Sequence, residues 1–270
     1  MMVLLMTAFG FVAADQQNVD YLKLFLTLIG TALSGGGAAA LNNYIERDLD
    51  AKMRRTSKRA LPLGLIEPIS ALYFGLVLTV LGVVLLVSTV NLLTAFLALL
   101  TTFLYTLVYT PLKRVTWLNT AIGAIPGALP PMGGWVAVSN SLDLGAWILF
   151  IILFVWQHPH FYSFAWLNKD DYSKANYKML PCIDGDGSKT FQQIVLYSVL
   201  LIIVAVLPTV FGMSGFVYAL GAGFASIWIL YLGIDLRKKQ TPVAAKKLFA
   251  ASLVYLPLLF VFVVFDNLII

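Results

Sequence analysis

The chain has 270 residues, of which 60% are hydrophobic and only 11% are charged, whereas an ordinary soluble domain has about 25% charged residues. With a mean hydropathy of +0.88, the composition excludes a soluble globule, which cannot bury so much apolar surface, and intrinsic disorder, which requires low hydrophobicity. The single cysteine, Cys182, excludes a disulfide framework. These properties are typical of an integral membrane protein.

Eight stretches have the roughly 20 mostly apolar residues that a membrane-spanning helix requires. They lie at about 20–45, 66–88, 91–110, 117–138, 144–168, 190–211, 214–234 and 245–267. A ninth apolar stretch, residues 1–14, has no basic region before it, so we interpret it as the last part of a first helix, incomplete or abbreviated, and not as a signal peptide. The sequence therefore predicts one all-α membrane domain, residues 1–270, of nine transmembrane helices.

The connections between these stretches alternate between those without a basic residue and those rich in basic residues. Segments 15–20, 88–91, 139–143 and 212–214 contain no Lys or Arg, whereas segments 47–65, 111–116, 169–190 and 235–247 hold 17 of the 18 basic residues. We expect the protein in the inner membrane of a bacterial cell or of a mitochondrion. By the positive-inside rule the basic segments face the bacterial cytoplasm or the equivalent side of the mitochondrial membrane. The net charge of +5 is thus an orientation signal, and we expect no nucleic-acid partner.

An acidic cluster lies where stretch 20–45 meets a basic connection. Asn42, Glu46 and Asp50 have i, i+4, i+8 spacing, which places them on one face of a helix. Like charges so placed destabilise a helix, unless a cation such as Mg²⁺, which prefers oxygen ligands and often accompanies phosphate, sits among them. The alternative is a solvated helix end whose acids pair with neighbouring arginines.

A second, weaker cluster, Asp170 and Asp171, closes stretch 144–168 on the same side of the membrane. Together the two clusters suggest a facing pair around Mg²⁺ and a diphosphate. Basic residues just outside their helices on this side would hold phosphate oxygens or act only as orientation charges. They are Arg55, Arg59, Lys113 and Arg114.

Three strings in order resemble one family. NNYIERDLDAKMRRTSKRAL, YTPLKRVTWLNTAIGAIPGALPPMGGW and WQHPHFYSFAWLNKDDYSKANYKMLP are similar to the first acidic motif, the central segment and the second motif of the heme O synthase (protoheme IX farnesyltransferase) branch of the UbiA superfamily of intramembrane prenyltransferases. Two departures stand out: Ala60 replaces a proline of the family string, and Trp166 stands where the superfamily has an aspartate before Asp170. The second departure leaves open how many metal ligands the second motif provides.

The resemblance implies nine helices around a central cavity, and transfer of farnesyl from farnesyl diphosphate to a vinyl group of heme B, giving heme O for terminal oxidase assembly. It implies the lipid bilayer as surroundings, with heme A synthase or terminal oxidase assembly proteins as partners. The implied catalytic residues are Asn42, Glu46, Asp50, Lys113, Asp170 and Asp171, all but Lys113 as Mg²⁺ ligands. The implied substrate contacts are Arg55, Arg59, Tyr109, Arg114, Asn119, His160 and Tyr162.

Two histidines, His158 and His160, flank Pro159 inside a predicted span. A histidine in a span is a functional candidate, and a neutral imidazole binds heme iron well. We predict that His160 contacts heme or ligates its iron. The alternative is a histidine hydrogen-bonded to the backbone carbonyl that Pro159 frees.

Two rival functions fit parts of the pattern. One is a UbiA-type enzyme with another acceptor, such as a quinone precursor, which the Pro-His string and the second motif disfavour. The other is a polytopic transporter, which would explain polar groups within spans. The polar residues gather at one membrane face, however, and the chain has no convincing internal repeat.

We interpret Gly35-Gly36-Gly37 as a close helix contact.

Overall fold

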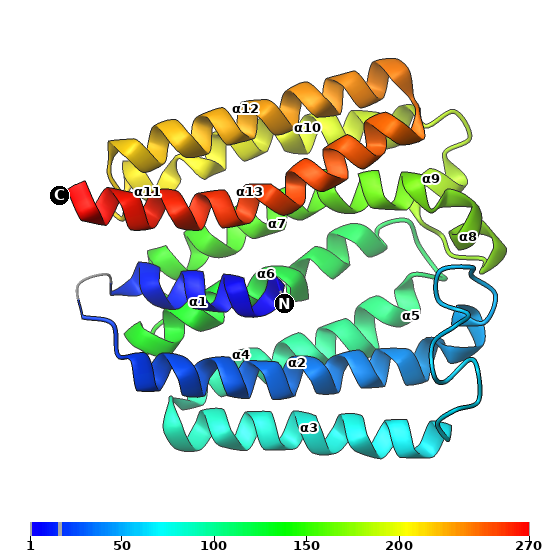
Figure 1. Ribbon diagram of the computed structural model, residues 1–270, viewed down its shortest axis with the longest axis horizontal. Helices are drawn as coiled ribbons and strands as arrows, with labels where there is room; N and C mark the ends of the chain where they lie inside the picture. The colour runs from blue at the N-terminus through cyan, green and yellow to red at the C-terminus, as the bar shows by residue number, and fades with distance from the viewer. Residues whose placement is uncertain (1, 16–17, 270) are drawn as a thin grey trace.

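The computed structural model describes residues 2–15 and 18–269, and every element in these ranges is helical (Figure 1). Eight helical segments are long and apolar enough to cross a membrane, as predicted. Six are single helices: α2 (Tyr21–Asp50), α3 (Pro68–Thr89), α6 (Asn119–Ser139), α7 (Leu144–Leu167), α12 (Phe216–Lys239) and α13 (Pro242–Ile269). Two are composite: α4 (Leu92–Phe103), η1 (Leu104–Tyr109) and α5 (Thr110–Leu112) form one, and α10 (Ser188–Ala205) with α11 (Leu207–Val210) forms the other.

The ninth apolar helix is α1 (Met2–Ala14), whose 13 residues extend only about 20 Å. It is part of the bundle nonetheless, because Met6 and Phe9 are buried in the core. A side chain at Gly10 would collide with the backbone carbonyl of Pro131 on α6. The prediction of a short first helix followed by eight spans is therefore confirmed.

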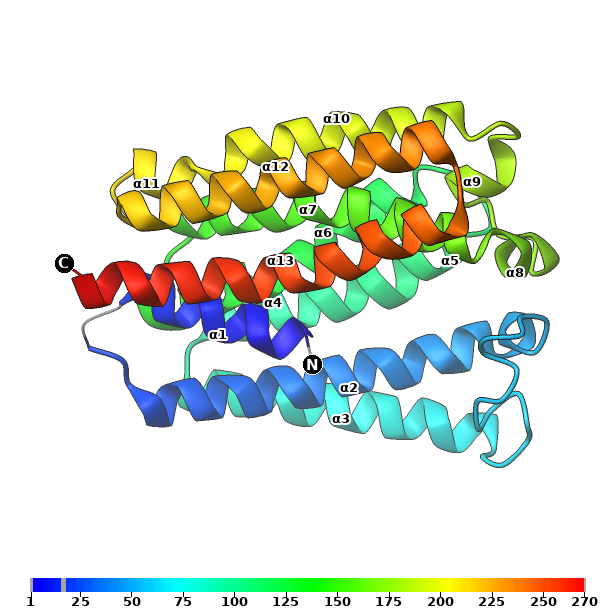
Figure 2. The ribbon, with the colours of Figure 1, turned by 45° about the horizontal axis from the view of Figure 1, so that its top comes forward.

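The helices form two groups joined through the centre of the bundle. Helices α2, α3 and α4 pack in sequence on one side, and α10, α12 and α13 pack on the other (Figures 1 and 2). Helices α6 and α7 pack against each other between these groups, and α1 covers α6. This arrangement places the last turns of α2 opposite the end of α7.

Small residues set the distance between α2 and α3. A Cβ atom at Gly37 would overlap the backbone of Gly75 and the side chain of Thr79, so these helices approach as closely as their backbones allow. Gly37 thus confirms the expectation of a close helix contact, whereas a Cβ at Gly35 would meet no atom within 4 Å.

The two ends of the bundle differ in charge. The basic connections lie at one end, together with the short helices α8 (Lys169–Lys174) and α9 (Leu180–Ile183) (Figure 1). At the opposite end, Asp20, Asn91 and Asp143 cap α2, α4 and α7 by accepting hydrogen bonds from free N–H groups of the first turn. Helix ends on that side are therefore satisfied by uncharged or acidic caps, in keeping with the positive-inside rule.

This sidedness predicts the pattern of chemical labelling in intact cells. In a Cys182→Ser background, cysteines introduced at Ser57 and Ser188 should resist a membrane-impermeant thiol reagent until the cytoplasmic side is opened. A cysteine at Ser139 should react from outside. Labelling of Ser57 and Ser139 from the same side would contradict the topology.

Candidate active site

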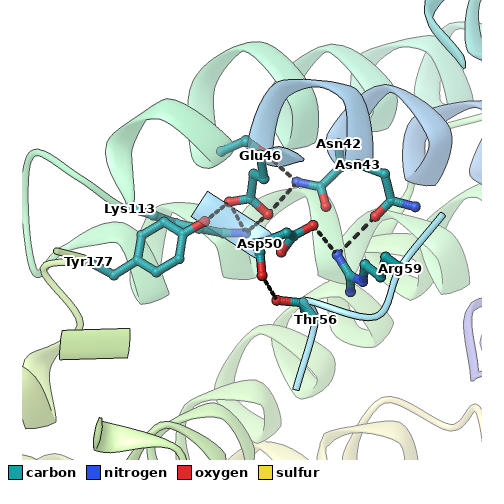
Figure 3. Close-up of polar contacts among 9 residues, drawn as sticks. Asn42, Asn43, Glu46, Asp50, Thr56, Arg59, Lys113 and Tyr177 are labelled. Carbon is teal, nitrogen blue, oxygen red and sulfur yellow. Dashed lines mark hydrogen bonds and ion pairs between the residues drawn. The ribbon is translucent and has the colours of Figure 1, made fainter. Parts of the chain in front are cut away.

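The polar face of α2 lies at its basic end. Asn42, Glu46 and Asp50 are buried, with 6%, 5% and 1% of their surface exposed. Helix α2 continues to Asp50, five residues beyond the predicted stretch, so the three side chains share one face as their spacing predicted (Figure 3). Because a buried carboxylate is costly unless it is compensated, its partners define the site.

Glu46 receives donors from its own helix and from two other segments (Figure 3). The Lys113 ammonium lies 3.0 Å from Oε1 and 3.1 Å from Oε2. The Tyr177 hydroxyl donates to Oε1 at 2.6 Å, and the Asn42 amide donates to Oε2 at 3.0 Å. The carboxylate is thus fixed in orientation, with a cation facing both of its oxygens.

Asp50 is held by the connection that follows α2. Nη1 of Arg59 lies 2.7 Å from the Asp50 carboxylate and also donates to Asn43 Oδ1 at 2.9 Å. The Thr56 hydroxyl donates to the main-chain oxygen of Asp50 at 3.0 Å. These bonds fold residues 51–59 back over the end of the helix.

A π-helical segment, η1, brings Lys113 to this site. The Thr110 hydroxyl donates to the Tyr105 carbonyl and accepts a hydrogen bond from Asn42 at 2.9 Å. A π-helix places one more residue in a turn than an α-helix and often occurs at functional sites. The Lys113 ammonium then passes 4.7 Å from the centre of the Tyr109 ring, which places Tyr109 beside Glu46 and Lys113, and its role in substrate binding stays a prediction.

The acids of the second motif lie on α8. Asp171 accepts a hydrogen bond from the Arg55 main-chain N–H at 3.2 Å, which ties α8 to the connection after α2, and Asp170 is exposed. Within residues 2–15 and 18–269 no group of three or more His, Cys, Asp or Glu side chains is arranged to hold a metal ion. Participation of Asp170 and Asp171 in metal binding therefore stays a prediction.

The donor set on α2 nevertheless suits Mg²⁺. This ion usually binds one or two carboxylates, keeps several waters and takes its other ligands from substrate phosphates. Glu46, Asp50 and the amide oxygen of Asn42 provide such a partial set, and the ammonium of Lys113 already occupies a cationic position against both Glu46 oxygens.

The other predicted contact residues are spread more widely. Arg55 and Arg114 are exposed at the basic end. Asn119 is buried and donates to the main-chain oxygens of Thr116 and Lys178. Tyr162 is 2% exposed and packs in the hydrophobic core, so the structure does not group it with Glu46 and Asp50. A role for these residues in substrate binding stays a prediction.

His160 belongs to an aromatic row along the contact between α7 and α13. Its ring stacks between Trp156 and Phe249, at centroid distances of 4.7 and 4.8 Å. Phe164 extends the row 5.1 Å from Phe249, and the Arg55 guanidinium lies 5.4 Å above the Phe164 ring. The row therefore runs from the basic connection after α2 to His160.

Ser252 holds the ring of His160 in place. The Ser252 Oγ lies 2.6 Å from the Phe249 carbonyl oxygen and 2.8 Å from Nδ1 of His160. In the tautomer in which Nδ1 donates to Ser252, Nε2 carries the lone pair that a metal ion would use.

His158 lies on another face of α7. It is fully buried, its ring stacks on Tyr197 at 3.6 Å, and Nδ1 bonds to the Phe154 carbonyl at 2.8 Å. This geometry fits the alternative in which a histidine of the span bonds to the helix backbone, here at the Phe154 carbonyl.

Sequence reasoning missed Tyr177, Thr110 and Ser252. Tyr177 and Thr110 stand within the quoted family strings, so the signal was present, but nothing in their spacing points to Glu46 or Asn42. Burial, and then the neighbouring Glu46 carboxylate, raise the pKa of Tyr177. Its hydroxyl therefore stays protonated and donates.

The chain belongs to the UbiA prenyltransferase family, whose family model matches residues 3–260. It is thus an integral membrane prenyltransferase. It is 42% identical over 251 residues to the protoheme IX farnesyltransferase of Solibacter usitatus, covering 93% of this chain and 86% of the relative. It is also 42% identical over 256 residues to the protoheme IX farnesyltransferase of Salinibacter ruber, covering 94% and 90%.

Solved structures share the fold at low sequence identity. A digeranylgeranylglyceryl phosphate synthase superposes with a TM-score of 0.82 at 18% identity, covering 100% of this chain and 94% of the other. A UbiA homologue from Archaeoglobus fulgidus, bound to DMAPP and Mg²⁺, has a TM-score of 0.68 at 16% identity, covering 96% and 94%. These likenesses confirm the predicted fold.

Neutralising Asp50 should disable the site without unfolding the bundle. We expect Asp50→Asn to lower turnover at limiting Mg²⁺ by about 10- to 100-fold, because it removes one of two carboxylates and the charge facing Arg59. Asp48→Asn is the matched control, since the Asp48 side chain is 79% exposed, and it should keep near-normal turnover. Normal turnover of Asp50→Asn at limiting Mg²⁺ would contradict the metal assignment.

Proposed function

We propose that the protein transfers the farnesyl group of farnesyl diphosphate to a vinyl group of heme B, giving heme O. The observation that carries this proposal is the 42% identity, over 93% of the chain, with a protein named protoheme IX farnesyltransferase. The arrangement of the polar face of α2 and of the aromatic row supports it, because each suits one of the two substrates.

The diphosphate would bind at the basic end of α2. Glu46 and Asp50, with Asn42, would hold Mg²⁺, which when bound stabilises the negative charge that develops on the departing diphosphate. Lys113 and Arg59 already lie against these carboxylates and would supply further positive charge to the phosphate oxygens. The exposed Arg55 and Arg114 would complete this cationic rim, with Asp170 and Asp171 approaching from α8.

The farnesyl chain would extend from this site into the bundle. A small cavity of about 50 Å³ lies among α1, α2, α4 and α6, and Ala38, Gly35, Ser34 and Thr31 of α2 line it. These positions continue the face of Asn42 toward the membrane interior. None of the residues that line the cavity is charged, so it would shield part of the apolar chain from water.

The reaction needs no covalent enzyme intermediate. The bond between farnesyl C1 and the diphosphate oxygen breaks, and the vinyl carbon of heme B attacks C1. Water then adds to the resulting cation and loses a proton, leaving a hydroxyl group on the product. The rings of Tyr105 and Tyr109, 5.7 Å apart beside Lys113, would stabilise the allylic cation.

Heme B would bind along the aromatic row. His160, whose Nδ1 is bonded to Ser252, would ligate or contact the iron through Nε2, and the rings of Phe164 and Phe249 offer flat apolar surface to a porphyrin. This row favours heme over a quinone precursor as acceptor, because a quinone has no metal for an imidazole. The product would pass within the bilayer to heme A synthase or to terminal oxidase assembly.

Purified protein should convert its substrates to a single new pigment. With heme B, farnesyl diphosphate and Mg²⁺, we expect a product whose mass equals heme B plus a farnesyl group plus a hydroxyl group, and chelation by EDTA should stop its formation. Prenylation of a quinone precursor without any heme product would contradict the choice of acceptor.

Two single substitutions should separate the two substrate sites. His160→Ala should change the Soret band of added heme B and weaken its binding, yet retain Mg²⁺-dependent binding of farnesyl diphosphate. Asp50→Asn should do the reverse, because the diphosphate is held at α2 and not at the aromatic row. An unchanged heme spectrum and unchanged turnover of His160→Ala would remove the role of His160.

A further inference from the structure

The connection between α8 and α9 reaches into the site through a single side chain. Tyr177 donates to Glu46 at 2.6 Å across 131 positions of sequence, and only 3% of its surface is exposed. We propose that Tyr177 is a positioning residue that orients the Glu46 carboxylate for the divalent cation. This inference rests on the proposed metal-dependent function and adds a residue to it.

The lone pairs of Glu46 show why this hydroxyl matters. A carboxylate has about four acceptor positions, and the Lys113 ammonium lies almost equally far from both oxygens, at 3.0 and 3.1 Å. Among the residues that the structure describes, Tyr177 and Asn42 supply the other donors, one to each oxygen. A divalent cation would take the position of the ammonium, with Lys113 turning to the phosphate, and Tyr177 and Asn42 would keep the outer positions, which prevents the carboxylate from rotating.

The main chain around Tyr177 is built to hold it in place. The Lys178 N–H donates to the Lys113 carbonyl at 2.7 Å, and the Asn119 amide donates to the Lys178 carbonyl at 3.0 Å. Asn176 adopts a left-handed conformation, with φ of 57°, which makes the tight turn that leads into Tyr177. The two segments that supply Lys113 and Tyr177 to Glu46 are thus bonded directly to each other.

The ring of Tyr177 is held by packing contacts that do not involve its hydroxyl. It packs in a hydrophobic cluster with Leu49, Met53, Ala175 and Met179. A phenylalanine would keep this packing, so Tyr177→Phe removes the hydrogen bond and leaves the ring contacts. The matched control is Tyr172→Phe, the same chemical change on a ring that packs edge-on against Tyr177 at 5.7 Å.

The first measurement is binding of Mn²⁺ to the purified protein without substrates, followed by electron paramagnetic resonance. We expect Tyr177→Phe to weaken Mn²⁺ binding by about tenfold, because the hydrogen-bond partners of ligating carboxylates typically contribute 10- to 100-fold to metal affinity. The Mg²⁺ concentration for half-maximal turnover should rise by a similar factor, whereas turnover at saturating Mg²⁺ should recover to within about twofold of wild type. Tyr172→Phe should match wild type in both measurements, and all three proteins should melt at similar temperatures without metal.

A double-mutant cycle distinguishes action through Glu46 from a general structural effect. In a Glu46→Gln background, Tyr177→Phe should cause no further loss of Mn²⁺ affinity, because the two changes disable the same contact. An additive loss, or unchanged Mn²⁺ and Mg²⁺ dependence of the single variant, would overturn the role of Tyr177. Failure of the wild type to bind Mn²⁺ would overturn the metal site together with this role. If the variants showed the expected Mn²⁺ affinities and Mg²⁺ dependence but the enzyme prenylated an acceptor other than heme, only the heme assignment would be overturned.

Discussion

A buried negative charge at the edge of the membrane organises this structure. Glu46 is almost fully enclosed, and taking such a charge out of water costs several kcal/mol unless close partners compensate it. The partners come from η1–α5, which supplies Lys113, and from the connection between α8 and α9, which supplies Tyr177. The need to neutralise this one carboxylate therefore explains why these two remote segments meet α2 at the basic end of the bundle.

The charged site and the aromatic row lie on different helices of the bundle. Close contacts such as that between Gly37 and Gly75 hold α2 rigidly against α3, so the polar face of α2 is fixed in position. On the other side, α7 and α13 present the aromatic row with His160. A charged substrate end and a flat, metal-containing acceptor thus have separate surfaces, which approach each other where Arg55 lies over Phe164.

Patterns along the chain were sufficient for the membrane topology and for one face of the site. The spans follow from apolar length and the sidedness from alternation of basic connections, which are local properties. The grouping of Asn42, Glu46 and Asp50 follows from the period of a helix. For Asp171, the pattern indicated the correct end of the membrane, and the structure adds its hydrogen bond to the main chain of Arg55.

The sequence by itself thus determined the class of protein, its spans, its orientation signal and the acidic face of α2, because each depends on neighbouring residues. Only the tertiary structure decided which side chains complete the site. Tyr177 meets Glu46 across 131 positions and Ser252 meets His160 across 92, and η1 changes the local helical period ahead of Lys113. Such contacts depend on how distant helices pack, and no spacing within one element encodes them.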